Sequence, residues 1–465
     1  MVWNWGSQTK NLIHYQIYDM ILLVIKVGGF FMFSPVKMCI IMWVAILSLY
    51  SIKLLDYGGL SGSFYLAVSL NLLFVLLGGI FARLCMPKSW NMKDSKENAQ
   101  NFINDMRAKE KGLLRIYKVL LFLGFVGILL IYTKVLSQIS FGSFISQQAT
   151  VKSLISRSVL GNYLASSAYV AIPVSVILVL INKKRKMLIV YPLIQCIVYS
   201  VSFWGRVPVM VALIMLVSSY LITKQSCNIA YGRSNKIKVM KLLVSSTLAF
   251  IFVISILSWT IELRMAEFGV GYTPYTYYLN YSSNLNLFLA ENLPDEGITY
   301  RGVVSTYSYL TASIPTLDFW VSRDSEFAMG QASFPYIARL FQQIGLIQGG
   351  ELITGDRPLG NGLQLPTLIG YAYIDYGYIG VILSGAFIGF IGNFLYLKNL
   401  RKPKLKFIFY LSNVYVLVLL APLISATAWT SFVIIIFGFV LVVAYIDKPV
   451  SKYRITWGDG SHLRQ

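Results

Sequence analysis

Histidine is almost absent from this chain of 465 residues, which has only His14 and His462 at its two ends. This scarcity excludes Ser-His-Asp chemistry, histidine-based acyl transfer and metal sites that are rich in histidine. Charged residues are also few, at 13%, whereas 56% of the residues are hydrophobic. The four cysteines lie in or beside apolar runs or in a basic loop, and they indicate no disulfide framework. The sequence therefore predicts neither a metal nor a cofactor.

Apolar runs recur along the whole chain, and each is long enough to cross a hydrocarbon core of about 30 Å as a helix. The runs are continuous rather than alternating, which excludes the strands of a membrane barrel. We expect an all-α polytopic integral membrane protein with about 10–11 transmembrane helices. The expected spans are residues 35–52, 64–84, 116–136, 163–182, 187–204, 207–223, 242–261, 367–397, 407–425 and 428–446.

Two of the apolar runs are ambiguous. MILLVIKVGGFFMF at 20–33 is interrupted by Lys26 and two glycines, so it is an interfacial helix, a re-entrant helix or a true span. The run at 367–397 exceeds the length of one span, and we expect its helix to emerge from the membrane, to tilt or to break. The start of the chain lacks the charged region and clean apolar region of a cleavable signal.

The net charge of +21 comes from short basic clusters between the apolar runs, which argues against nucleic-acid binding. The positive-inside rule places such clusters in the cytoplasm. They lie at 85–115, 183–186, 224–241 and 398–406. All four clusters fall on one side of the membrane if each of the ten expected spans crosses it. The C-terminal tail from Asp447 lies on the same side.

Residues 262–366 contain no lysine, and they include ten acidic residues and five arginines. A long, net acidic loop without lysine belongs on the outer side. Its tyrosine, phenylalanine, leucine and isoleucine content is not that of a disordered linker. We therefore divide the chain into an N-terminal bundle (1–261), an outer loop domain (262–366), C-terminal helices (367–446) and a cytoplasmic tail (447–465).

The outer arginines are candidates for binding an anion, because a guanidinium grips a phosphate or carboxylate with two parallel donors. Arg206 occupies a very short turn in SFWGRVPVM, where it either snorkels harmlessly or faces a diphosphate at the interface. The arginines of the large loop either bind substrate or pair with nearby acids. They include Arg264, Arg301, Arg323 and Arg339.

Aromatic and acidic residues gather in the same loop. Tyr309 and Trp320 suit the stacking of sugar rings, although they also suit an interfacial belt or the small core of the loop. Asp318 and Glu326 are candidate general bases or partners of a sugar hydroxyl, or else members of structural ion pairs. Within LIGYAYIDYGYIGVI, Asp375 lies among tyrosines that include Tyr373, and a carboxylate at that depth usually faces the bundle interior or a wet cavity.

Two helical features frame these candidates. RLFQQIGLIQGG, from Arg339, has the spacing of a short amphipathic helix that ends at glycine and can lie flat on a membrane. Gly385 and Gly389 form a pair with three residues between them, which favours close helix packing.

Four motifs together resemble the O-antigen polymerases (Wzy), the oligosaccharide repeat-unit polymerases of bacteria. They are SFWGRVPVM at 202–210, SYLTASIPTLDFWV at 308–321, FPYIARLFQQIGL at 334–346 and TLIGYAYIDYGYIGVI at 367–382. The number of spans and the large outer loop in the C-terminal half are similar across essentially the full chain. Members of the family carry functional arginines in outer loops, some in an Arg-x10-Gly pattern, and Arg339 with Gly350 fits that spacing.

The resemblance implies a GT-C-like membrane glycosyltransferase of the bacterial inner membrane with its active site facing the periplasm. Such an enzyme joins repeat units carried on undecaprenyl diphosphate, without a nucleotide sugar or a required metal. It implies membrane lipid as the surroundings and a chain-length regulator and a flippase of the same lipopolysaccharide pathway as partners. On this reading, Arg206 with Arg264 or Arg339 holds the donor diphosphate, and Asp318 or Glu326 orients or deprotonates the acceptor hydroxyl. Arg301, Arg323, Tyr309, Trp320, Tyr373 and Asp375 are expected to bind the glycan or its carrier.

Three other functions remain open from the sequence, namely a lipid-linked oligosaccharide flippase, an O-antigen ligase and a peptidoglycan-type polymerase. A lipid-linked oligosaccharide flippase would show shorter loops and charges buried in many spans. An O-antigen ligase would share most of the features above, but the ligases that we would compare carry a functional histidine in the large loop, and this loop has none.

Overall fold

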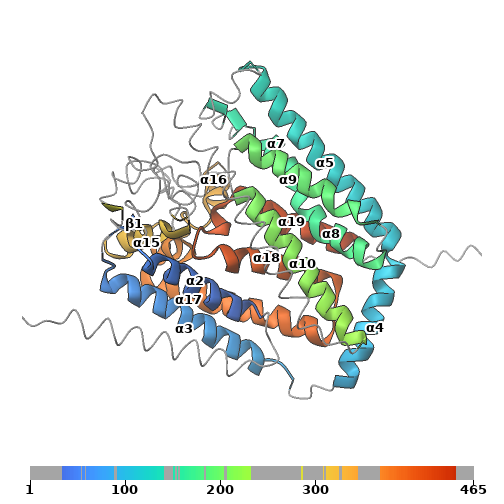
Figure 1. Cartoon of the computed structure of the whole chain (residues 1–465), viewed down its shortest axis with the longest axis horizontal. Helices are drawn as coiled ribbons and strands as arrows, with labels where there is room; N and C mark the ends of the chain where they lie inside the picture. The colour runs from blue at the N-terminus through green and yellow to red at the C-terminus, as the bar shows by residue number, and fades with distance from the viewer. Residues whose placement is uncertain are drawn as a thin grey trace, which may run out of the picture.

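The computed structural model describes residues 34–53, 55–57, 59–87, 92–140, 150–151, 154–155, 158–182, 185–203, 207–231, 284–285, 307, 310–323, 327–343 and 367–446. Helices dominate this part of the chain (Figure 1). The one pairing of strands in it joins β1 (Leu55–Asp56) to β2 (Asn284–Leu285) in antiparallel register. The described residues therefore confirm the expected helical class.

Five stretches of helix in the described part of the chain are long and apolar enough to cross a membrane. They are α3 (Gly62–Leu84), α5 (Glu110–Leu136), α7 with α8 (Val159–Ala165 and Ser167–Ile181), α10 (Val207–Tyr231) and α17 (Leu368–Arg401). Their length matches the thickness of a hydrocarbon core. The chain is thus a membrane-embedded helical protein.

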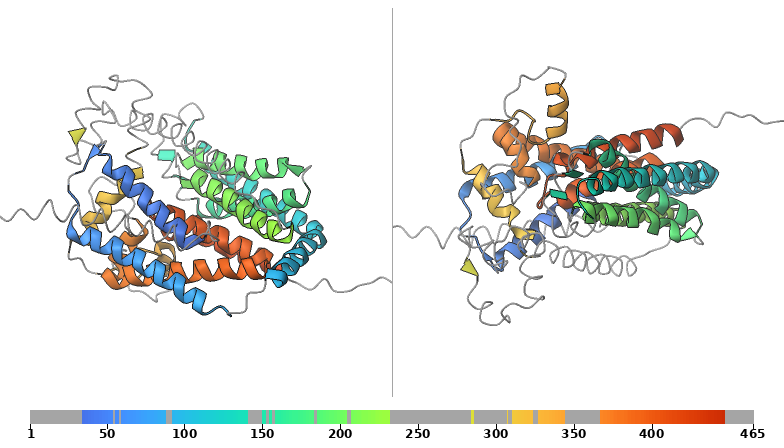
Figure 2. Two further views of the ribbon diagram at one scale, coloured as in Figure 1. Left: turned by 60° about the horizontal axis from the view of Figure 1, so that its bottom comes forward. Right: turned by 90° about the horizontal axis from the view of Figure 1, so that it is seen from above.

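Four shorter apolar helices coincide with further predicted spans. They are α2 (Pro35–Ser51), α9 (Met187–Phe203), α18 (Leu405–Leu420) and α19 (Thr430–Ile446), the last preceded by a short 3-10 turn, η3 (Ala426–Ala428). The long helices share one general direction (Figure 2). The predicted span at 242–261 and the ambiguous run at 20–33 lie outside the described residues.

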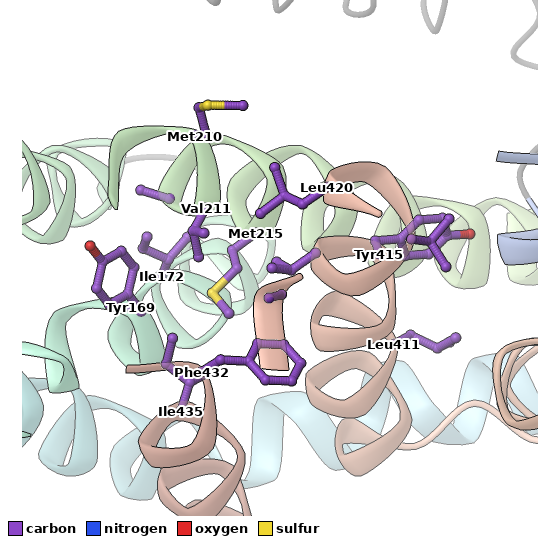
Figure 3. Packing of buried hydrophobic residues seen from close by; sticks show 14 of the residues in the cluster. Tyr169, Ile172, Met210, Val211, Met215, Leu411, Tyr415, Leu420, Phe432 and Ile435 are labelled. Carbon is purple, nitrogen blue, oxygen red and sulfur yellow. The ribbon is translucent and has the colours of Figure 1, made fainter. Parts of the chain in front are cut away.

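A buried apolar core joins helices from both halves of the chain. Figure 3 shows Met215 of α10 pointing toward Ile172 of α8 and Phe432 of α19. All three side chains belong to one cluster, in which Met215 and Ile172 are fully buried. Phe409 of α18 also stacks on Phe439 of α19, with ring centroids 5.3 Å apart. The N-terminal and C-terminal helices therefore form one packed bundle.

Helix α4 (Met92–Ala108) corrects the sequence prediction, which treated residues 85–115 as a basic loop. Its apolar residues recur every three or four positions, and Ala99, Phe102 and Met106 are buried. The helix packs on α10, and Asn98 Nδ2 donates a hydrogen bond of 3.2 Å to the carbonyl oxygen of Arg401 at the end of α17. Its low overall hydropathy hid a clear amphipathic pattern.

Helices α3 and α17 run parallel and approach closely. Asn71 Nδ2 donates to the carbonyl oxygen of Val381 at 2.9 Å, and further along both helices Asn393 Nδ2 donates to that of Gly79 at 2.6 Å. Gly385 faces the backbone of Asn71, and Gly389 faces the backbone of Val75. This confirms the predicted role of the glycine pair in close packing, since only glycine lets the two backbones approach this far.

We expect Gly389→Ala to destabilise the protein because the added methyl group would overlap the carbonyl oxygen of Val75. The free energy of unfolding should fall by about 1–3 kcal/mol, the usual cost of overpacking. Thermal unfolding in detergent measures it. Gly112→Ala, in the first turns of α5 with open space around the site, is the matched control and should be neutral or slightly stabilising. Equal unfolding curves for both variants would contradict this account of the α3–α17 contact.

Candidate functional site

The long apolar run that begins at residue 367 breaks near its start. Tyr376 has φ −145° and ψ 19°, and Gly377 has φ 58° and ψ −145°, so α17 consists of a short first part and a long second part. The conformation of Gly377 lies in the left-handed region that glycine adopts without strain. The length of the run at 367–397 predicted a helix that emerges from the membrane, tilts or breaks, and the structure shows a break.

A segment of the large loop docks on this break. Ala328 N donates a hydrogen bond of 3.0 Å to the carbonyl oxygen of Ile374, and Met329 N donates one of 3.2 Å to that of Asp375. These two carbonyls belong to the last helical turn before the break, where the backbone at 376 and 377 is no longer helical. We call residues 327–334 together with 374–377 the kink junction.

The carboxylate of Asp375 completes the kink junction. Its side chain is only 1% exposed, and its two oxygens accept hydrogen bonds from different backbone amides of the loop segment. Ala332 N donates to Oδ1 at 2.9 Å, and Ser333 N donates to Oδ2 at 2.8 Å. A buried carboxylate is costly unless such donors satisfy it. Asp375 was predicted to bind substrate, and this geometry adds that its carboxylate positions the loop segment.

The kink junction leads directly into α16 (Pro335–Gln343), which carries Arg339. This helix corrects the predicted start at Arg339, because it begins four residues earlier with proline in its first turn, a favoured position. The side chain of Arg339 and the predicted glycine end at 349–350 lie outside the described part of the structure. Asp375 nevertheless fixes the segment from which α16 begins.

Asp318 anchors a second loop helix, α15 (Ser313–Val321), to the start of α3. Its Oδ1 accepts hydrogen bonds from the backbone amide of Ser61, at 3.0 Å, and from the Ser61 hydroxyl. Ser61 is also the N-cap of α3, where its Oγ accepts from Phe64 N. A carboxylate beside a helix N-terminus is favourable because the amide dipoles there carry partial positive charge. Asp318 Oδ2 accepts no hydrogen bond from the residues that the structure describes.

Trp320 connects α15 to the kink junction. Its half-buried indole packs against a small cluster that consists of Ala328, Ala332, Tyr371 and Ile374. Its Nε1 is buried and has no acceptor in the described structure. The cluster places Trp320 next to the residues that neighbour Asp375 and its amide partners. The aromatic side chain is therefore part of the small core of the loop, one of the three roles that the sequence left open.

Two further candidates make local contacts. The guanidinium of Arg323 lies 3.7 Å from the centroid of the Phe319 ring, a cation–π contact at the exposed end of α15. Tyr373 meets Tyr378 edge to face, with centroids 5.2 Å apart, and packs against the main core of the bundle. Helix α15 therefore contacts the start of α3 through Asp318 and the cluster beside Asp375 through Trp320, while Arg323 and Tyr373 have separate neighbours.

Several predicted site residues cannot be placed in this arrangement. They lie outside the described residues and comprise Arg206, Arg264, Arg301, Tyr309 and Glu326. Sequence reasoning in turn missed Ser61, whose position before an apolar run is a recognisable N-cap signal. Nothing in the sequence indicates that its partner lies 257 residues away.

No group of three or more histidine, cysteine, aspartate or glutamate side chains gathers among the described residues in a way that would hold a metal ion. The two predicted site carboxylates that the structure describes, Asp318 and Asp375, both lie toward the end of the bundle at which α3 and α17 begin. Comparisons of the chain with protein-family models, curated proteins and solved structures give no match.

Proposed function

We propose that the chain is a GT-C-like membrane polymerase that joins undecaprenyl-diphosphate-linked oligosaccharide repeat units at the outer face of the bacterial inner membrane. Its product on this proposal is O-antigen or a related surface polysaccharide. The proposal rests on the resemblance of four sequence motifs to O-antigen polymerases. One structural observation adds support: the basic segments lie at one end of the bundle, and the candidate site lies at the other end.

The basic segments gather at one end. Arg401, at the end of α17, donates a hydrogen bond of 2.9 Å from its guanidinium to the carbonyl oxygen of Pro87, shortly after α3. The predicted cytoplasmic segments 85–115 and 398–406 therefore meet. Helices α3 and α17 are parallel, so their starts lie together at the other end, with Asp318, Trp320 and Asp375. This arrangement agrees with an outward-facing site under the positive-inside rule.

The proposed reaction moves a glycan from one carrier to another. The bond between the anomeric carbon of the donor glycan and its diphosphate oxygen breaks, and undecaprenyl diphosphate leaves with the bonding electrons. A hydroxyl oxygen on the distal sugar of the acceptor unit forms the new bond to that carbon and loses its proton to a carboxylate. Arg206 with Arg264 or Arg339 stabilises the charge on the departing diphosphate. Asp318 or Glu326 orients the acceptor hydroxyl and takes its proton.

Asp318 can both anchor α15 and accept a proton, since Ser61 engages only its Oδ1. We expect Asp318→Asn to keep the anchor, because an amide oxygen can still accept from Ser61, and to slow polymerisation by about 10²-fold through loss of the base. Ser61→Ala is the matched variant. It should lower the free energy of unfolding by about 1 kcal/mol and leave turnover near that of the wild type. Slow turnover in Ser61→Ala and normal turnover in Asp318→Asn would assign Asp318 a structural role alone.

A gel of surface polysaccharide from a deletion strain tests the function. The proposal predicts that the deletion leaves a lipid core that bears a single repeat unit and that the wild-type gene restores the ladder. Loss of both the ladder and the single unit would indicate a flippase or an earlier enzyme. A bare core with accumulated lipid-linked polymer would indicate a ligase. A ladder that persists in the deletion strain would refute all three functions.

A further inference from the structure

The exposed side chains and the length of the second part of α17 indicate where the membrane lies. Ile379, Leu383 and Phe387 recur at one helical period and are 60–67% exposed, which marks a lipid-facing stripe. From Ile379 to Lys398, the first basic residue near the end of the helix, the rise of 1.5 Å per residue gives about 28 Å. That length matches a hydrocarbon core of about 30 Å. The break at 376–377 therefore lies at the boundary of the hydrocarbon core.

The kink junction fixes a segment of the large loop at this boundary. Four hydrogen bonds from residues 328–333 reach Ile374 and Asp375, directly before the break. The ring of Phe327 also lies against Gly377, where an added Cβ would come within 3.0 Å of two ring carbons. The start of α16 is thus held at the level of the membrane surface.

Large apolar side chains protrude from this segment and from α16. Phe327 and Met329 are 51% and 66% exposed, and the exposed apolar residues of α16 and its entry are Phe334, Ile337 and Phe341. Ala338, which follows Ile337 in the same helix, is buried. Phe334, directly before the helix, and Ile337 and Phe341 within it are spaced three and four residues apart and so share one face. Figure 2 shows α16 running across the direction of the long helices, as a helix in the membrane plane would.

We propose that α16 is an interfacial anchor that inserts Phe334, Ile337 and Phe341, together with Phe327 and Met329, into the boundary between lipid headgroups and acyl chains. The partner is the bilayer itself. The apolar face continues the lipid-facing stripe of α17 through the contact of Phe327 with Gly377. An amphipathic helix at this level buries its apolar face about 5–10 Å into the interface. The inference concerns how the loop sits on the membrane and does not depend on the proposed reaction.

Depth-dependent quenching tests the anchor. Bimane is attached to Ile337→Cys or Phe341→Cys in a background with Cys85→Ser and Cys227→Ser, while Cys39 and Cys196 remain because they are buried. Each protein is reconstituted in nanodiscs of phosphatidylcholine with bromine placed high on the acyl chains. We expect quenching of about twofold for both positions, since bromine at that depth lies within the 5–10 Å reached by an interfacial helix.

Two controls come from the same structure. Leu383→Cys lies on the α17 stripe and should be quenched most by bromine placed deep in the acyl chains. Gln342→Cys lies on α16 but away from the exposed apolar face and should be quenched weakly by lipid and strongly by aqueous iodide. Lipid quenching at 337 and 341 no greater than at 342 would overturn the proposal. So would disulfide crosslinking of Ile337→Cys between copies, because a second copy would then cover the face.

Discussion

Asp375→Ala is expected to reduce polymer formation by about 10²-fold or more while the protein remains in the membrane. The variant leaves the buried amide of Ala332 and the partly buried amide of Ser333 without acceptors and frees the segment that leads into α16. Each unsatisfied amide costs about 1–3 kcal/mol. A displacement of about 1 Å in groups that bind substrate can cost 10²-fold in rate. The length distribution of surface polysaccharide, normalised to membrane levels of the protein, measures the effect.

Asn393→Ala is the matched control for Asp375→Ala. Asn393 is on the same helix, and its amide donates to the carbonyl oxygen of Gly79 far from the kink junction. This variant should lose about 1 kcal/mol of stability, as expected for one partly buried hydrogen bond, and keep its polymer. Polymer formation by Asp375→Asn should lie between that of Asp375→Ala and that of Asn393→Ala. The amide keeps one acceptor oxygen but turns its NH₂ group toward a backbone donor. Full-length ladders from Asp375→Ala at normal abundance would show that positioning α16 does not matter for function.

The second large effect is expected for Arg206→Ala, which should lower polymerisation by about 10²–10³-fold. The proposal assigns Arg206 to the departing diphosphate, and loss of one preorganised donor has effects of this size. Arg206→Lys should recover only part of the rate, because an ammonium group cannot provide the two parallel donors of a guanidinium. Initial rates with purified protein and a lipid-linked repeat unit measure both variants.

Arg185→Ala controls for the general loss of an arginine. Arg185 pairs with Glu110 at 2.8 Å, and both side chains are partly exposed, so the pair contributes at most about 1 kcal/mol. Turnover should stay close to that of the wild type. A similar rate loss in Arg185→Ala and Arg206→Ala would point to expression or stability rather than to diphosphate binding. Normal ladders from Arg206→Ala would remove that residue from the proposed site.

The membrane helices could be predicted from the sequence because their signal is local. Runs such as 64–84 and 187–204 need only length and hydropathy, and α3 and α9 follow them closely. Helix α4 was missed because its mean hydropathy is low, although Phe102 and Met106 follow a helical period. The early start of α16 was missed because the proline at its first position was not used as a start signal.

The candidate site was predicted less well because its contacts are distant in sequence. The polarity of Asp318 and Asp375 singled them out, but their partners lie 257 and 42–43 residues away. No local pattern specifies such pairings. The break at Gly377 is a further example, since YIDYGYIG permits a continuous helix as well as a bend. Its left-handed conformation follows from the loop segment that docks there.

Reconstitution with defined substrate tests the central claim most directly. The purified chain in proteoliposomes is supplied with undecaprenyl-diphosphate-linked repeat units and no other enzyme. The account predicts a ladder of longer lipid-linked glycans with release of undecaprenyl diphosphate, one molecule for each new linkage, and no ladder with Arg206→Ala. Movement of intact units across the bilayer without new linkages would contradict it and identify a flippase.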